Sequence, residues 1–200
     1  MLQAETRGKF FRKGGELVEF FIDGKSTGRT LSGGDGVAYK EYTPLRAGTM
    51  KITVKSAHEQ GSGLLSSLQK GTGVVLIDFE GSVIEKGFSF KPKEGSQSAI
   101  EKISKRFPIV LLQTGILGTT AIKKWMKENG FIDLTIVPWE QGVFLEEMRE
   151  KGLKIKAIIG SQNLIESVKE YKLRAFSFEE GENSEEVNDW KEISHKIKKM

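Results

Sequence analysis

Residues Val74–Val83 read VVLIDFEGSV, and this stretch decides the fold of the longer part of the chain. Four apolar residues lead to Asp78, and Glu80 and the pair Gly81-Ser82 follow directly. A buried strand of an open α/β sheet presents its last side chains at the carboxyl edge, where such sheets bind ligands. The turn that follows can offer backbone N–H groups to an anion. The stretch therefore predicts a strand with a carboxylate site at its end; the plainer alternative is that Asp78 only caps the strand.

The same organisation continues to the C-terminus. Apolar runs alternate with amphipathic stretches, which predicts an α/β domain with a parallel sheet covered on both faces. The expected strands are Val74–Phe79, Ile109–Gln113, Leu134–Val137, Ile155–Ile159 and Ala175–Phe178. The expected helices are Ser96–Arg106, Thr119–Asn129, Val143–Lys151, Asn163–Tyr171 and Ser184–Lys198. With right-handed crossovers, we expect five parallel strands in the order 3-2-1-4-5.

The first 57 residues have a different pattern. Short β-rich runs are separated by glycine-containing turns, and Lys51–Lys55 alternates polar and apolar side chains as half-buried strands do. Asp23-Gly24 supplies positions that tolerate the positive φ of a tight hairpin turn. Residues 58–71 show neither the alternation of a strand nor the amphipathic pattern of the C-terminal helices, and they are expected to form a linker or a short helix. We therefore expect three segments, at 1–57, 58–71 and 72–200.

Composition narrows the class of protein. The chain has 200 residues, with 31 basic and 27 acidic side chains and a formal net charge of +4. The two signs are interspersed, which predicts a mixed solvated surface and gives no nucleic-acid signature beyond the short basic tail at 196–199. The absence of cysteine excludes disulfides and thiolate zinc sites. No apolar run reaches the roughly 20 residues of a membrane span, and no signal peptide begins the chain. We expect a soluble protein, either cytoplasmic or exported as part of a longer one.

Two stretches resemble motifs of the haloacid dehalogenase (HAD) superfamily. Asp78, Glu80 and Ser82 resemble its first motif, in which aspartate, any residue, aspartate, glycine and threonine follow a strand. The resemblance implies that Asp78 is a nucleophile that becomes an aspartyl-phosphate and that Glu80 is the general acid/base. The stretch Phe107–Gly115, FPIVLLQTG, resembles the second motif, and it implies that the Thr114 hydroxyl binds the transferring phosphoryl group.

The same resemblance implies a substrate site and a metal site. The implied substrate-binding residues are Gly81, Ser82 and Gly115. The implied Mg²⁺ ligands are Asp78, Glu80 and Ser161. The stretch Leu153–Lys169 has the strand, glycine and helix of the fourth motif, but Ser161 and Ile165 occupy the places of its carboxylates. Because Mg²⁺ prefers carboxylate oxygens, we expect its binding to be weak or lost.

The third motif of the superfamily is a lysine that neutralises the nucleophile and the phosphate. Its candidates are Lys151, Lys154 and Lys156, of which we include Lys154 in the catalytic set. A solvated lysine at the end of an element is the alternative for each. No cap domain fits between the motifs, so the resemblance implies an open site that suits a large phosphorylated substrate.

The N-terminal segment resembles the immunoglobulin-like modules of bacterial surface proteins. The resemblance lies in VEFFIDG (Val18–Gly24), GDGVAYKEYTP (Gly34–Pro44) and AGTMKITV (Ala47–Val54). It implies a small β-sandwich that lacks its first strand, and neighbouring modules of the same kind as partners, because an unpaired edge accepts another strand.

Two functions remain open at this point. The first is a Mg²⁺-dependent phosphatase that hydrolyses a phosphate monoester through an aspartyl-phosphate on Asp78. The second is a catalytically degenerate HAD-like module that acts as a binding or structural unit with the immunoglobulin-like segment. The intact Asp78, Glu80 and Thr114 favour the first function, whereas Ser161 and Ile165 favour the second.

Overall fold

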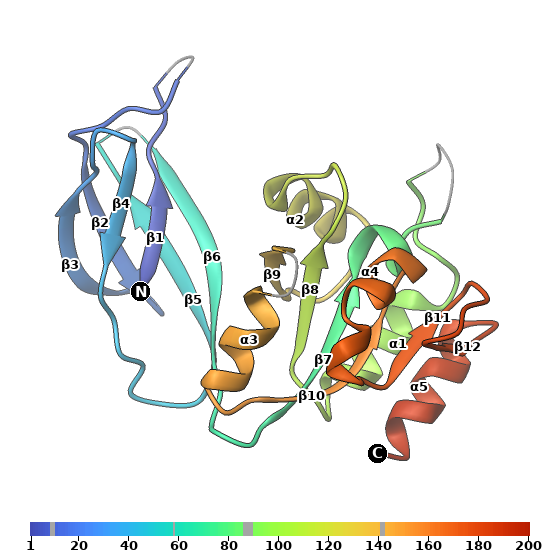
Figure 1. The fold of residues 1–200 in the computed structure, drawn as a ribbon. Helices are drawn as coiled ribbons and strands as arrows, with labels where there is room; N and C mark the ends of the chain where they lie inside the picture. Colours follow the sequence, from blue (N-terminus) through green and yellow to red (C-terminus); the bar gives the residue numbers. More distant parts are fainter. Residues whose placement is uncertain (9–10, 58, 86–89, 141–142) are drawn as a thin grey trace. The chain divides into compact units, whose positions relative to one another are not determined.

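The structure is a computed structural model that describes residues 1–8, 11–57, 59–85, 90–140 and 143–200. The chain divides into two compact units, Met1–Leu68 and Gln69–Met200, whose elements are labelled in Figure 1. Among the residues in these ranges, no helix is both long and apolar enough to cross a membrane.

The N-terminal unit is built from antiparallel strands. These are β1 (Leu2–Glu5), β2 (Leu17–Ile22), β3 (Lys25–Leu31), β4 (Val37–Lys40), β5 (Gly48–Lys55) and β6 (Gln60–Ser67). One sheet has four strands in the order β3-β2-β5-β6, and β1 and β4 form a separate two-stranded sheet.

The period-two pattern of β2 explains the core of this unit. Val18, Phe20 and Ile22 are buried on one face of the strand, where they join Leu2, Ala38 and Met50 in one cluster. Asp23 and Gly24 both have positive φ, 48° and 82°, which gives the two-residue turn from β2 to β3. Such a turn matches the right-handed twist of the strands that it joins.

The expected immunoglobulin-like sandwich is wrong. The structure has a four-stranded and a two-stranded antiparallel sheet. Residues 60–67, expected in the linker, form β6, which pairs with β5 over its full length from Gly48↔Ser67 to Lys55↔Gln60. This segment, QGSGLLSS, contains no β-branched or aromatic residue, so local propensity gave no strand signal. Pairing with the neighbouring strand decides its conformation.

The C-terminal unit alternates strands and helices. Its strands are β7 (Gly73–Asp78), β8 (Ile109–Gln113), β9 (Thr135–Pro138), β10 (Lys154–Ile159), β11 (Ala175–Ser177) and β12 (Glu185–Glu186). Its helices are α1 (Ser96–Ser104), α2 (Thr119–Glu128), α3 (Val143–Glu150), α4 (Gln162–Ser167) and α5 (Trp190–Lys198), with a π-helical turn η1 (Phe79–Val83) and a 3-10 turn η2 (Lys169–Tyr171).

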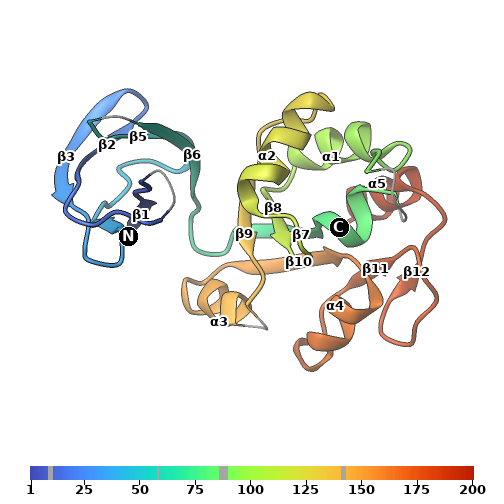
Figure 2. The same cartoon turned by 90° about the horizontal axis from the view of Figure 1, so that it is seen from above.

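One sheet organises this unit. Its six strands are all parallel and have the order β12-β11-β10-β7-β8-β9, so β7 lies in the middle. The view in Figure 2 shows α1, α2 and α5 on one face and α3 and α4 on the other. Alternate residues of β7 serve these two layers, because Val75 and Ile77 join the cluster with α1, α2 and α5 while Val74 and Leu76 are buried outside it.

The expected five-stranded sheet is also wrong. A sixth strand, β12, pairs in parallel with β11 through Phe176↔Glu185 and Ser177↔Glu186. The expected last helix included these residues, but α5 begins only at Trp190, where the Asp189 side chain accepts a hydrogen bond from the Glu192 N–H at 2.7 Å. Two adjacent glutamates show no alternation of apolar and polar residues, so β12 has no strand signal in the sequence.

Candidate functional site

Asp78 is the last residue of β7, and its side chain is completely buried. Its Oδ1 accepts hydrogen bonds from the Gly81 N–H at 2.9 Å and from the Thr114 hydroxyl at 2.5 Å. Its Oδ2 accepts hydrogen bonds from the Ser161 N–H at 3.1 Å and from the Ser161 hydroxyl at 2.9 Å. The carboxylate therefore joins the ends of β7, β8 and β10.

Glycines allow the backbone to approach this carboxylate closely. A Cβ atom at Gly81 would overlap the Asp78 carboxylate, and one at Gly160 would lie 2.9 Å from the Asp78 Cβ. Overlap of this kind would force the strand ends apart. Gly160 directly follows the apolar run of β10, a signal that the sequence offered for a close approach.

Glu80 does not share the environment of Asp78. Its Oε1 accepts a hydrogen bond from the Leu117 N–H at 2.8 Å, and its Oε2 accepts one from the Ile116 N–H at 3.3 Å. These amides belong to the loop between β8 and α2. A Cβ at Gly115, in the same loop, would overlap the Glu80 carboxylate. Glu80 thus fixes the loop that carries Gly115.

Ser82 faces the interior. It is fully buried, and its hydroxyl donates to the backbone oxygen of Asp78 at 2.5 Å. The indole N–H of Trp190, which is also buried, donates to the Ser82 backbone oxygen at 3.0 Å. Trp190 was not among the expected site residues, and it ties the first turn of α5 to η1.

The lysine candidates lie at the other end of the sheet. Lys154 pairs with Gly73 at the start of β7, and Asp78 ends the same strand five residues later. At about 3.3 Å per residue, this corresponds to roughly 16 Å. The ammonium of Lys151 pairs with Glu147 at 3.2 Å, and the Lys156 stem packs beside Gly73. The structure therefore places none of these lysines beside Asp78.

No family model matches the chain, and no curated protein matches it either. What the site can do therefore rests on its geometry. The structure brings Asp78, Thr114 and Ser161 together, with Gly81 against them, and it ties Glu80 and Gly115 to each other beside this group. It separates Lys154 from all of them.

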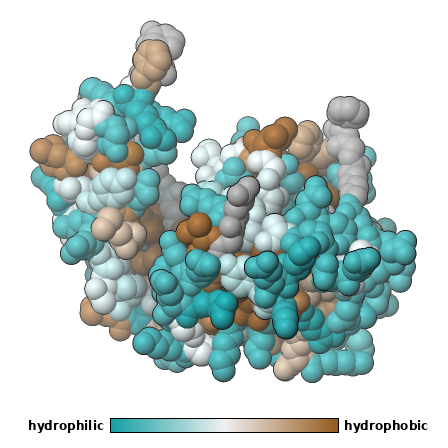
Figure 3. All heavy atoms as spheres, viewed as in Figure 1, coloured by the Kyte–Doolittle hydropathy of each residue, from teal (hydrophilic) through white to brown (hydrophobic). Residues whose placement is uncertain are grey.

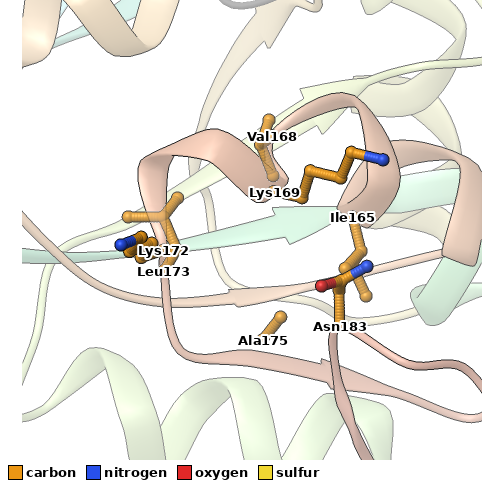
Figure 4. Close-up of a pocket in the computed structure, with 7 residues that line it drawn as sticks. All are labelled: Ile165, Val168, Lys169, Lys172, Leu173, Ala175 and Asn183. Carbon is orange, nitrogen blue, oxygen red and sulfur yellow. The ribbon is translucent and has the colours of Figure 1, made fainter.

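Ile165 contributes an apolar side chain to a hollow beside β11. It is almost fully buried in α4, and it lines this hollow together with Ala175 and Asn183, as Figure 4 shows. Lys169 also lines this hollow, but its ammonium pairs with Glu166 at 3.3 Å.

The expected Mg²⁺ ligands do not fit a hard cation. A carboxylate offers about four lone-pair positions, and the four hydrogen bonds to Asp78 use that number. Glu80 accepts backbone N–H groups with both oxygens, and Ser161 adds only a neutral hydroxyl. Throughout the part of the chain that the structure describes, no three acidic, histidine or cysteine side chains gather in a way that could hold a metal.

Proposed function

We propose that residues 69–200 form a catalytically degenerate HAD-like module that acts as a binding or structural unit with the N-terminal β unit. In this proposal, Asp78 keeps the position of a nucleophile but serves as an anchor between strands. The observation that carries the proposal is the buried Asp78 carboxylate, whose two oxygens each accept two hydrogen bonds.

The hydrogen bonds at Asp78 oppose a nucleophilic role. A nucleophile must direct a lone pair at phosphorus from a distance of about 3 to 3.5 Å. Four protein groups donate hydrogen bonds to the Asp78 carboxylate, which is completely buried. Attack would require the Asp78 side chain to break bonds to Thr114 or Ser161 and move toward the surface.

Charge balance also favours the proposal. A phosphate ester brought to this edge would meet the carboxylates of Asp78 and Glu80, and like charges at short range repel. Phosphoryl-transfer sites offset this repulsion with metal ions or cationic side chains. Lys154, the lysine that the resemblance offered for this purpose, lies roughly five residues of strand away.

The phosphatase is the second candidate function, because Asp78 lies in hydrogen-bond contact with Thr114 and Ser161. The rate at which the full chain hydrolyses p-nitrophenyl phosphate, measured at increasing Mg²⁺ concentration, distinguishes the two functions. We expect the rate to equal that of the buffer blank and to be unchanged by Asp78→Asn. A Mg²⁺-dependent rate that falls by several orders of magnitude in a folded Asp78→Asn variant would instead establish the phosphatase.

A further inference from the structure

A groove between α1 and α5 is lined by basic side chains and small residues. Its volume is about 380 Å³. It is lined by Gly95, Ser98, Ala99 and Lys102 from α1 and its start, and by Lys191, Ser194, His195 and Lys198 from α5. Within the described residues, no carboxylate lines it.

The groove follows from how the two helices pack. Gly95 lies against Trp190 at the start of both helices, and the Arg106 guanidinium donates to the Lys198 backbone oxygen at their ends. The helices therefore run side by side in the same direction. Each contributes residues at i, i+3, i+4 and i+7, which form one stripe on a helix. Small residues on the α1 stripe leave the hollow, and long basic residues border it.

The lysines of the groove differ from those lysines of the unit that pair with a glutamate. Lys105, Lys151 and Lys196 each pair with a glutamate four residues earlier, at 3.0, 3.2 and 3.4 Å. The sequence places no acidic residue three or four positions before or after Lys102 and Lys191, and none three or four positions before Lys198. In the described part of the structure, none of these three forms an ion pair, and all three are exposed.

Acidic side chains are within reach of other lysines on the surface of this unit. The surface over α4 and α5 is mostly hydrophilic (Figure 3), and acidic partners are available there, as the pairing of Lys196 with Glu185 at 3.1 Å shows. Lys196 lies on a different side of α5 from the groove. A cleft lined by one sign of charge concentrates ions of the opposite sign.

We propose that the α1–α5 groove binds a compact ligand that carries two or more phosphate groups. Lysine is a common phosphate ligand, and the hydroxyls of Ser98 and Ser194 add hydrogen-bond donors. Lys191 and Lys198 are seven residues apart, about 10.5 Å along a helix. A chain of phosphates spans this distance, so that each lysine can contact a phosphate of its own. The proposal is independent of the role of Asp78.

The test is calorimetric titration of the full chain with inorganic tripolyphosphate at low ionic strength. We expect saturable binding that weakens as salt is added, because exposed charges are screened. The double variant Lys102→Gln/Lys191→Gln should bind at least about tenfold more weakly, a change of about 1.4 kcal/mol. The control Lys124→Gln/Lys151→Gln removes the same charge from two lysines that pair with glutamates outside the groove.

A second variant keeps the charge constant. Ser98 is exposed on α1, so Ser98→Leu should fill the groove and weaken binding while circular dichroism stays that of the folded protein. Lack of saturable binding, or equal loss in the two double variants, would overturn the proposal. Citrate is the competing oxyanion, and citrate binding as tight as that of tripolyphosphate would overturn the assignment to phosphate.

Discussion

At the scale of single residues, the structure at the end of β7 depends on four hydrogen-bond donors that surround the carboxylate of Asp78. Ser161 provides two of the four hydrogen bonds to Asp78, through its backbone N–H and its hydroxyl. Gly81 and Thr114 provide the others. A buried charge is stable only when it is hydrogen-bonded in this way, so each donor is expected to contribute to stability.

Replacing the hydroxyl of Ser161 by a second carboxylate should therefore destabilise the protein. In Ser161→Asp, an anion would stand against Asp78 in place of a donor, and we expect the free energy of unfolding to fall by at least about 2 kcal/mol. Urea unfolding measures this change, and Ser161→Ala separates the loss of the hydroxyl from the added charge.

Mg²⁺ should affect the Ser161→Asp variant differently from the natural protein. Two facing carboxylates form a site that a hard cation prefers, so Mg²⁺ should restore part of the stability of the variant and leave that of the natural protein unchanged. Equal stabilisation of both proteins would show that the natural sequence already holds the metal.

At the scale of elements, the sequence predicted the strands that have a strong apolar pattern. The apolar run before Asp78 and the apolar run of Ile109–Gln113 both form buried strands. The same apolar runs predicted where the site residues lie, because the carboxyl ends of neighbouring parallel strands meet at one edge of the sheet. The strands β6 and β12 were missed because pairing with a neighbour, which a single sequence does not record, decides their conformation.

Glu185 in the edge strand β12 forms ion pairs with Arg174 and Lys196. Hydrogen bonds from Arg174 and, to a smaller extent, Lys196 lower the pKa of Glu185 below its ordinary value of 4.5, against the opposing effect of desolvation. Because the folded-state pKa is the lower one, the stabilisation is present above pH 4.5 and is lost as the pH falls through the folded-state pKa.

The variant Glu185→Gln should therefore cost stability only where the carboxylate is charged. We expect a loss of no more than about 1 kcal/mol at neutral pH, since the pair is partly exposed and screened. The difference should disappear as the pH falls below 4.5 in a series of urea unfolding curves. Glu182→Gln, at an exposed position, is the control. A difference that stays constant down to acid pH would contradict the assignment to ion pairing.

At the scale of the whole molecule, the two units differ in the size of their cores. The cluster of the C-terminal unit draws on β7, β8, β10 and β11 and on three helices. The cluster of the N-terminal unit contains six buried residues. Units of fewer than about 70 residues rarely gain more than a few kcal/mol from such a core.

Separate expression of the two units should reveal this difference. Residues 69–200 should unfold cooperatively on their own, with a midpoint close to that of the same unit in the full chain. Residues 1–68 should be only marginally folded. Circular dichroism during urea unfolding of both fragments and of the full chain makes the comparison. A fragment 69–200 that is unfolded in buffer would show that its core is incomplete without the N-terminal unit.

The free energy of unfolding of Asp78→Asn tests the anchor role most directly. The amide can flip, but each orientation sets its NH₂ group against a backbone N–H, either that of Gly81 or that of Ser161. We predict a loss of about 2 to 4 kcal/mol, whereas Asp133→Asn at an exposed position should change stability by less than about 0.5 kcal/mol. Because functional carboxylates are commonly kept at the expense of stability, an Asp78→Asn variant as stable as the natural protein, or more stable, would contradict the structural role.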